Sequence, residues 1–229
     1  MQDVIIKLPY QKFYFKQPLR LYESRLLRSA ILKRIEPYDV LYHNHINDGV
    51  RFEYPLIQYK SINGKAAILY LGDGIESIHA LFSKRPGKVW VRGREINLEI
   101  ERMESKLYRL YLTAEPLQYK IFNWLPLQDE NYREYKRLTG DESRKTFLKN
   151  ILKGNILAFA KGVDWHIDGE LEVSRFRVSE PRWISYKNVK FLAFNAEFGL
   201  NAVLPAHIGL GKGAAHNYGV VFGGKPFNK

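Results

Sequence analysis

The sequence contains no cysteine among its 229 residues. This absence excludes disulfide bonds, thiolate nucleophiles and every zinc site that needs sulfur ligands, and it is typical of cytosolic proteins. The chain also lacks any apolar run near the roughly 20 residues that a membrane-spanning helix needs. Its apolar N-terminal stretch, VIIKL, is too short and too polar at its flanks for a signal peptide. We therefore expect a soluble, cytoplasmic protein.

Acidic residues are the scarcer charged type. The chain has 24 Asp and Glu against 36 Lys and Arg, which gives a formal net charge of +12. Such a surface attracts polyanions, nucleic acids above all, although a basic surface can also be merely solvated. The hydrophobic fraction of 45% is ordinary for a folded protein, so disorder does not explain the charge. The charge favours a nucleic-acid partner over an uncharged small molecule.

The first hundred residues alternate strand and helix patterns in the order of a ferredoxin-like unit, βαββαβ. The strongest local indication is Asn63-Gly64, which lies between two apolar runs and is typical of a two-residue hairpin turn. The expected elements are a strand at 4–8, a helix at 21–35, strands at 54–60 and 66–71, a helix at 74–82, and a strand from 88 to 100 with a break at Gly93.

The second half repeats this pattern with parts lost or altered. A strand begins near Lys106, two helical pieces separated at Gly140 lie between 129 and 159, and strands at 171–178 and 183–198 lead to a glycine-rich end. The predicted fold class is α+β, with two tandem ferredoxin-like (RRM-like) domains at 1–104 and 105–229. The second is modified and carries a C-terminal glycine-rich loop.

A lysine stripe lies on the second predicted helical piece. Lys145, Lys149 and Lys153 recur every four residues, so they share one helix face opposite the apolar side chains. Such a stripe is either a solvated face or a contact surface for RNA or DNA.

Four glycines lie within eleven residues near the C-terminus, in LPAHIGLGKGAAHNYG (204–219). A phosphate-binding P-loop is excluded because Ala206 stands where its first glycine should be and Gly213 follows Lys212. A dinucleotide-binding fold is excluded because too few residues remain for its crossover helix. The segment is either a set of plain turns or a loop whose backbone N–H groups, with Lys212, hold phosphates.

Two histidines two positions apart, His43 and His45, would point to the same side of an extended backbone. Metal binding would need more ligands, and only Asp48 is near in sequence. Isolated surface histidines are the simpler alternative. A functional pair is attractive because histidine titrates near pH 6.5, so that one imidazole can be neutral while its neighbour is protonated.

The segment LPAHIGLGKGAAHNYGVVF resembles the C-terminal glycine-rich motif of the CRISPR-associated endoribonucleases of the RAMP superfamily, which cut precursor CRISPR RNA within its repeats. LYHNHINDGVRFEYPLIQYKSINGK is similar to the N-terminal segment of the branch with paired histidines, and NWLPLQDENYREY and ILKGNILAFAKG resemble the middle of that branch. Two positions depart from the motif, His216 and Asn217. Asn tolerates a left-handed backbone, so the loop geometry is expected to survive.

The resemblance implies that His43 and His45 are catalytic, together with a tyrosine downstream for which Tyr54 is the nearest match. We assign His45 as the acid and His43 as the base. It also implies that the glycine loop holds RNA and does not cut it. The residues assigned to RNA binding are Arg51, Gly209, Gly211, Lys212, Gly213, His216, Gly219, Lys145, Lys149 and Lys153, and no metal or other cofactor is expected.

The predicted activity is therefore metal-independent cleavage of CRISPR repeat RNA by its own 2′-hydroxyl, which gives a 2′,3′-cyclic phosphate and a 5′-hydroxyl. The alternative is a non-catalytic RNA-binding RAMP subunit of an interference complex, and the paired histidines argue against it. CRISPR repeat RNA is the expected partner, an interference complex is a second candidate, and a dimer is a candidate oligomeric state.

Overall fold

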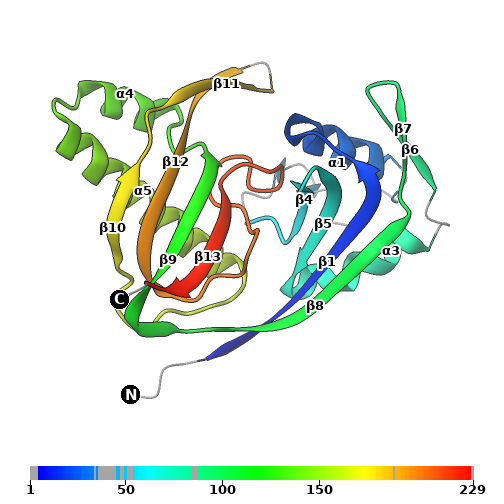
Figure 1. Cartoon of the computed structure of the whole chain (residues 1–229), viewed down its shortest axis with the longest axis horizontal. Coiled ribbons are helices and arrows are strands. Elements are labelled where there is room, and N and C mark those ends of the chain that lie inside the picture. Colours follow the sequence, from blue (N-terminus) through cyan, green and yellow to red (C-terminus); the bar gives the residue numbers. More distant parts are fainter. Residues whose placement is uncertain are drawn as a thin grey trace. The chain divides into compact units, whose positions relative to one another are not determined.

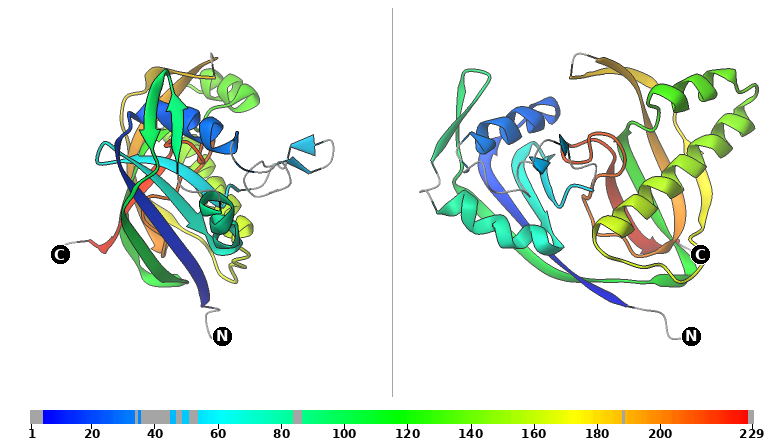
Figure 2. Two further views of the ribbon diagram at one scale, coloured as in Figure 1. Left: turned by 90° about the vertical axis from the view of Figure 1, so that its right-hand side faces the viewer. Right: turned by 180° about the vertical axis from the view of Figure 1, so that it is seen from behind.

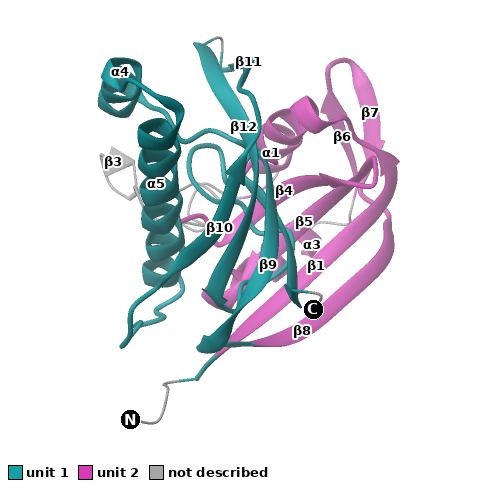
Figure 3. Cartoon of the chain, turned by 60° about the vertical axis from the view of Figure 1, so that its left-hand side comes forward, with its two compact units in different colours: residues 1–6, 109–214, 218–229 teal, residues 7–108, 215–217 magenta. Residues whose placement is uncertain are grey.

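The computed structural model describes residues 5–33, 35, 45–46, 49–50, 54–83, 87–187 and 189–227, without the side chains of 45, 46, 49 and 50. The chain forms two compact units (Figure 3). Unit 2 comprises Lys7–Tyr108 together with Ala215–Asn217, and unit 1 comprises residues 1–6, 109–214 and 218–229. The sequence predicted a division at 104/105, and the contacts divide the chain at 108/109.

Unit 2 is built on a four-stranded sheet with the order β4-β5-β1-β8. When the four strands are numbered by their position in the chain, their order across the sheet is second, third, first, fourth. This is the ferredoxin-like order. The pairs β1·β5 and β4·β5 are antiparallel. The strands are β1 (Ile6–Pro18), β4 (Ile57–Ile62), β5 (Lys65–Leu71) and β8 (Ile100–Leu110), and the helical segments are η1 (Leu21–Glu23), α1 (Ser24–Leu32), η2 (Gly72–Ser77) and α3 (Ile78–Phe82).

The hairpin predicted from Asn63-Gly64 is confirmed. Both residues have positive φ, 51° and 75°, so the turn reverses the chain in two residues and pairs Ile62 with Lys65. The core of unit 2 forms where α1 and α3 cover one face of the sheet, and it includes Phe15, Leu27 and Tyr59. Figure 2 shows these helices on one side of the blue and cyan strands.

The stretch from 88 to 100 is strand-like on both sides of its predicted break at Gly93, but it is not the last strand of the sheet. This segment forms a separate hairpin of β6 (Lys88–Val91) and β7 (Arg94–Asn97), because Arg92 and Gly93 have φ values of 52° and 73° and turn the chain back. The fourth strand of the sheet is β8, which begins at Ile100. The strand pattern that the sequence placed near Lys106 thus belongs to the end of β8 and to β9 (Leu112–Trp124).

Unit 1 has the strand order β10-β12-β9-β13, with β11 paired to β12. This is again the order second, third, first and fourth, so the predicted tandem ferredoxin-like architecture is confirmed. The modification lies between β12 and β13, where the glycine-rich segment replaces the second helix. The remaining elements are α4 (Asp129–Arg137), α5 (Asp141–Gly162), β10 (Val173–Val178), β11 (Arg182–Tyr186), β12 (Val189–Ala202) and β13 (Val220–Pro226).

Helix α5 covers one face of the unit 1 sheet (Figures 1 and 2). Its fully buried side chains, Leu148, Leu152, Ile156 and Phe159, recur every three or four residues and therefore form one apolar stripe. They leave the lysines on the flank of the helix. Within the described residues, no helix is long and apolar enough to cross a membrane.

Candidate nucleic-acid interface

The glycine-rich segment is fastened to its own unit by backbone hydrogen bonds. The Leu210 N–H donates to the Gly219 carbonyl at 2.9 Å, and the Gly219 N–H donates to the Asn123 carbonyl at 3.1 Å. The Val221 N–H donates to the Ile208 carbonyl at 2.9 Å. The segment is thus a closed loop at the start of β13 and is held by β9, the strand beside it.

Two of the glycines are required by the close approach of neighbouring groups. Gly219 has φ +60°, and a Cβ there would overlap the Leu210 carbonyl oxygen. Gly211 has φ +77°, and a Cβ there would lie 2.6 Å from Oδ1 of Asn155, which accepts the Trp124 indole N–H at 2.9 Å. Both positions combine a left-handed backbone with no room for a side chain. These glycines therefore set the shape of the loop, whatever the loop binds.

Lys212 is half-buried at the tip of this loop. Its ammonium donates to Oε1 of Gln128 at 2.9 Å and lies 5.0 Å from the centre of the Phe191 ring. In the part of the chain that the structure describes, Lys212 forms no ion pair with a carboxylate. Its charge is positioned but not neutralised, which suits a contact to phosphate.

Residues 215–217 of the same motif belong to unit 2. The Tyr59 N–H donates to the Ala215 carbonyl at 2.7 Å, the Ser61 N–H donates to Asn217 Oδ1 at 3.3 Å, and His216 pairs in parallel with Tyr59. These contacts cover the edge strand β4. Asn217 has φ +64°, the left-handed conformation expected of it. His216 is only 7% exposed, which favours a structural role over a direct contact to RNA.

The predicted catalytic residues and the nearby RNA-binding candidate Arg51 are placed only in part. His43 and Arg51 lie outside the described residues. His45 belongs to β2 (His45–Ile46), which pairs antiparallel with β3 (Gly49–Val50), so that His45 lies opposite Val50. Two histidines two positions apart point to the same side only if the backbone is extended, and the backbone at His45 is extended.

Tyr54 precedes β4 and is not one of its residues, so the predicted strand began three residues too early. The side chain is half-buried, and its hydroxyl accepts a hydrogen bond from Nε2 of Gln58 at 2.9 Å. Burial raises the pKa of Tyr54 above its ordinary value. The phenol therefore stays protonated near neutral pH and can donate a hydrogen bond but cannot act as a base.

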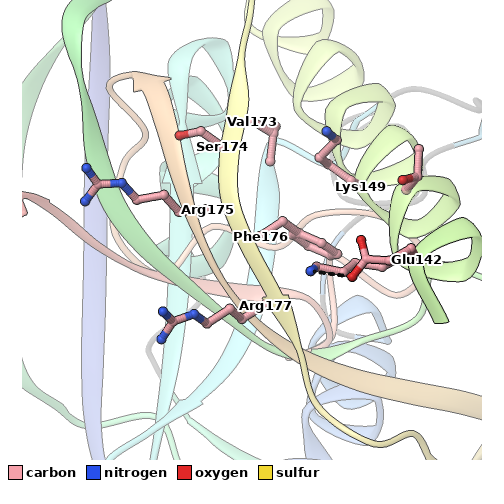
Figure 4. A pocket seen from close by; sticks show the side chains of 9 residues that line it. Glu142, Lys149, Val173, Ser174, Arg175, Phe176 and Arg177 are labelled. Carbon is pink, nitrogen blue, oxygen red and sulfur yellow. Dashed lines mark hydrogen bonds and ion pairs between the residues drawn. The ribbon is translucent and has the colours of Figure 1, made fainter.

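The lysine stripe of α5 lies along a cavity of about 440 Å³ between α5 and β10. Lys145 and Lys149 line this cavity, and Lys145 pairs with Glu142 at 3.2 Å. Lys149 and Lys153 are half-buried and form no ion pair among the described residues. Figure 4 shows Lys149 and Phe176 in the space between the two elements, with the Arg175 and Arg177 side chains directed away from α5.

The described residues offer no group of three His, Asp or Glu side chains that could hold a metal ion. The described part of this interface supplies cations, backbone N–H groups and aromatic rings, which suit contacts to nucleic acid.

The chain matches two family models in succession: the Cas6b N-terminal domain over residues 5–109 and the Cas6b C-terminal domain over residues 111–223. The chain belongs to the Cas6b family. The sequence resemblance to CRISPR-associated RNA-processing endoribonucleases is thus confirmed. The boundary between the two Cas6b domains falls at the end of β8, where the fold itself divides.

Relatives of known structure have the same fold. A crystal structure of Cas6b superposes with a TM-score of 0.85 at 23% identity, covering 95% of this chain and 100% of the other. A crystal structure of the CRISPR RNA processing endoribonuclease Cas6b gives a TM-score of 0.71 at 22% identity with the same coverage. An uncharacterized protein of Methanocaldococcus jannaschii is 31% identical over 143 residues, which are 59% of this chain and 96% of the relative.

The sequence reasoning missed an aromatic group on α4. Tyr132 and Tyr135 are half-buried at the wall of a second cavity in unit 1, beside Trp183. The sequence does indicate this aromatic group, because the two tyrosines lie three residues apart on a predicted helix with Lys136 next to them. An amphipathic stripe on a short helix usually packs into the core, whereas α4, all of whose residues are described, has none buried.

Proposed function

We propose that this protein is a metal-independent endoribonuclease that cuts precursor CRISPR RNA within its repeats. The observation that carries the proposal is the match to both Cas6b domains, which spans residues 5–223. One of the solved relatives that shares this fold is a CRISPR RNA processing endoribonuclease. The net charge of +12 supports a polyanionic substrate.

In the proposed reaction, RNA supplies its own nucleophile. A neutral imidazole, His43, takes the proton of the 2′-hydroxyl, and the oxygen forms a bond to the adjacent phosphorus. The bond from phosphorus to the 5′-oxygen then breaks, and protonated His45 gives that oxygen a proton. The products are a 2′,3′-cyclic phosphate and a 5′-hydroxyl. Each proton transfer is worth roughly 10²- to 10⁴-fold in rate.

The other assigned residues bind the RNA and stabilise the negative charge that develops on the scissile phosphate. Tyr54, whose phenol stays protonated, donates a hydrogen bond to the phosphoryl oxygens as negative charge develops, and Arg51 stabilises the same charge. The glycine loop presents Lys212 to the phosphate backbone, with Lys145, Lys149 and Lys153 as further phosphate contacts. Contacts of this kind position the RNA irrespective of base identity.

We expect cleavage of repeat RNA to proceed at an unchanged rate in excess EDTA and to leave a cyclic phosphate on the 5′ product. The reason is that none of the proposed steps needs a Lewis acid or a metal-bound hydroxide. The measurement is single-turnover cleavage of labelled repeat RNA with and without chelator, followed by end-group analysis. Loss of activity in EDTA with rescue by magnesium or manganese would reject this mechanism. Tight binding without any cleavage would favour the non-catalytic alternative.

We expect Lys212→Met to lower the affinity for repeat RNA by about 5- to 10-fold at moderate salt and to reduce the slope of log K against log salt by about 1, because one phosphate contact is lost. The methionine keeps the packing against Phe191. Gly211 is left unchanged, since a side chain there would distort the loop. Cleavage at saturating protein should keep its rate.

The matched control is Lys161→Met, which removes an exposed lysine from the last turn of α5. It should change the affinity less than twofold. If Lys212→Met bound RNA as tightly as the wild type with the same salt dependence, the loop would be a structural turn only.

A further inference from the structure

A second cavity, of about 600 Å³, lies within unit 1 between α4, the start of α5 and the connection from β10 to β11. Figure 1 shows these elements next to one another at the top of the unit. The volume falls within the range of small-molecule sites in proteins, roughly 300–1,000 Å³. The lining side chains include Tyr132, Tyr135, Lys136, Arg144, Glu180 and Phe194.

Aromatic rings form one wall of the cavity. Tyr135 packs edge-on against Phe194, with 6.1 Å between ring centres, and Tyr132 packs edge-on against Trp183 at 6.4 Å. Trp183 is 59% exposed, an unusual state for so large an apolar side chain. Tyr132, Tyr135 and Phe194 line the cavity and offer flat faces on which a planar ligand can stack, whereas Trp183 contacts Tyr132 and does not line the cavity.

Cations lie directly over these rings. The Arg144 guanidinium carbon is 5.5 Å from the centre of the Tyr135 ring, and the Lys136 ammonium is 5.7 Å from that of Tyr132. Nε of Arg144 donates to the Leu138 carbonyl at 3.2 Å, which fixes the guanidinium in place. Across the described residues, neither Arg144 nor Lys136 forms an ion pair. Both cations are thus held at the wall without a direct ion pair to a carboxylate.

The same cavity contains acceptors. Asp141 and Glu180 line it together with the tyrosine hydroxyls. Two carboxylates repel a bare phosphate cluster, so the site does not suit an inorganic polyphosphate. They do suit a ligand that also carries N–H and hydroxyl donors, because a carboxylate accepts from a base amino group or a ribose hydroxyl. Rings, cations and acceptors together match the parts of one nucleotide.

We propose that this cavity binds one unpaired nucleotide of the RNA, with its base on Tyr132 and Tyr135 and its phosphates at Arg144 and Lys136. The proposal rests on the RNA-processing function proposed above and adds a recognition site to it. Of the residues assigned to catalysis, Tyr54 belongs to unit 2, as does the backbone of His45, whereas the cavity lies wholly in unit 1. We assign the cavity to affinity and register, since none of its lining residues has a role in the proposed reaction.

The cavity also continues toward the lysine stripe. Lys145 and Arg177 line both this cavity and the smaller one along α5, which Lys149 borders. An RNA strand that places one base on the tyrosines can therefore run its backbone along α5. The aromatic cavity would then fix the register of a strand that the lysines hold without regard to sequence.

The test is a binding titration with repeat RNA that carries a 2′-deoxy sugar at the scissile position, so that no cleavage is needed. We expect Tyr132→Leu combined with Arg144→Met to lower the affinity by roughly 10- to 100-fold, the loss expected for one stacked base and its charge contact. The matched control is Arg133→Met on the same helix, an exposed residue that does not line the cavity. It should change the affinity less than twofold. Thermal melts of all variants establish that they fold.

A second measurement locates the nucleotide. Repeat RNA with single 5-iodouridine substitutions, irradiated in complex with the wild-type protein, should cross-link at one unpaired position to the peptide that contains Tyr132 and Tyr135. The same titration with free mononucleotides should show no binding at micromolar concentration. Tight binding of a free mononucleotide, cross-links only elsewhere, or a double variant that melts normally and binds RNA like the wild type would each overturn the proposal. Failure of the proposed function is distinct, because it would appear as wild-type protein that does not cut the 2′-hydroxyl substrate.

Discussion

We expect His45→Ala to slow single-turnover cleavage of repeat RNA by roughly 10²- to 10⁴-fold, a barrier increase of about 3 to 5 kcal/mol. Without this imidazole the departing 5′-oxygen must leave as an alkoxide or take its proton from water. Binding should change less than twofold, because the histidine acts on the reacting atoms and not on the backbone contacts. His43→Ala should give a loss of the same order, since it removes the other proton transfer.

Three further variants test whether the loss of rate is specific to His43, His45 and Tyr54. The double variant should lose less than the product of the single losses, because the two histidines act as a unit. His166→Ala removes an exposed histidine of unit 1 and should leave the rate unchanged. Tyr54→Phe keeps the ring and removes the hydroxyl, so a slower rate with a normal melting temperature would assign the phenol to the site. Wild-type rates for both histidine variants would remove the catalytic pair from this mechanism.

The pH dependence follows from the same assignment. A base that must be neutral and an acid that must be protonated give a rate that falls at both low and high pH. Tyr54 adds no limb to this profile near neutral pH, because burial holds its pKa above the ordinary range and the phenol remains protonated.

We expect a single 2′-deoxy sugar, placed on the nucleotide 5′ of the scissile phosphate, to abolish cleavage altogether. The substitution removes the nucleophile itself, so no rearrangement of the site can compensate. Affinity should be retained, because the contacts to phosphates and bases are unchanged. The measurement is the same single-turnover assay with the modified RNA at saturating protein.

The control moves the deoxy sugar one nucleotide to the 3′ side, where the 2′-hydroxyl takes no part in the reaction. That RNA should be cut at the wild-type rate. Continued cleavage of the first substrate would mean that water, and not the RNA, attacks the phosphorus.

Much of unit 2 could be predicted from the sequence because its determinants are local. Asn63-Gly64 specifies a two-residue turn whatever surrounds it, since both residues tolerate the positive φ that the turn needs. The order of strand and helix patterns was enough to predict the ferredoxin-like class. The glycine motif and the His-x-His pattern were enough to indicate the family, because they are short, specific strings.

The fourth strand of that unit could not be predicted in the same way. Residues 88–91 have a strand-like pattern, whereas Ile100, Met103 and Leu107 do not follow a two-residue alternation, so the local pattern does not show that 100–110 joins the sheet. The left-handed pair Arg92-Gly93 folds the first stretch back on itself, which leaves Ile100–Leu110 to complete the sheet order.

By itself, then, the sequence determined the α+β class, the tandem ferredoxin-like plan, the basic surface and the family, all of which depend on composition or on residues close together in the chain. Only the tertiary structure decided the pairing of Ala215 and Asn217 with Tyr59 and Ser61, and the cavity that brings α4 to β12. These contacts join segments separated by roughly 60 to 160 residues, and their free energy arises only when the chain closes those loops and buries the surfaces together.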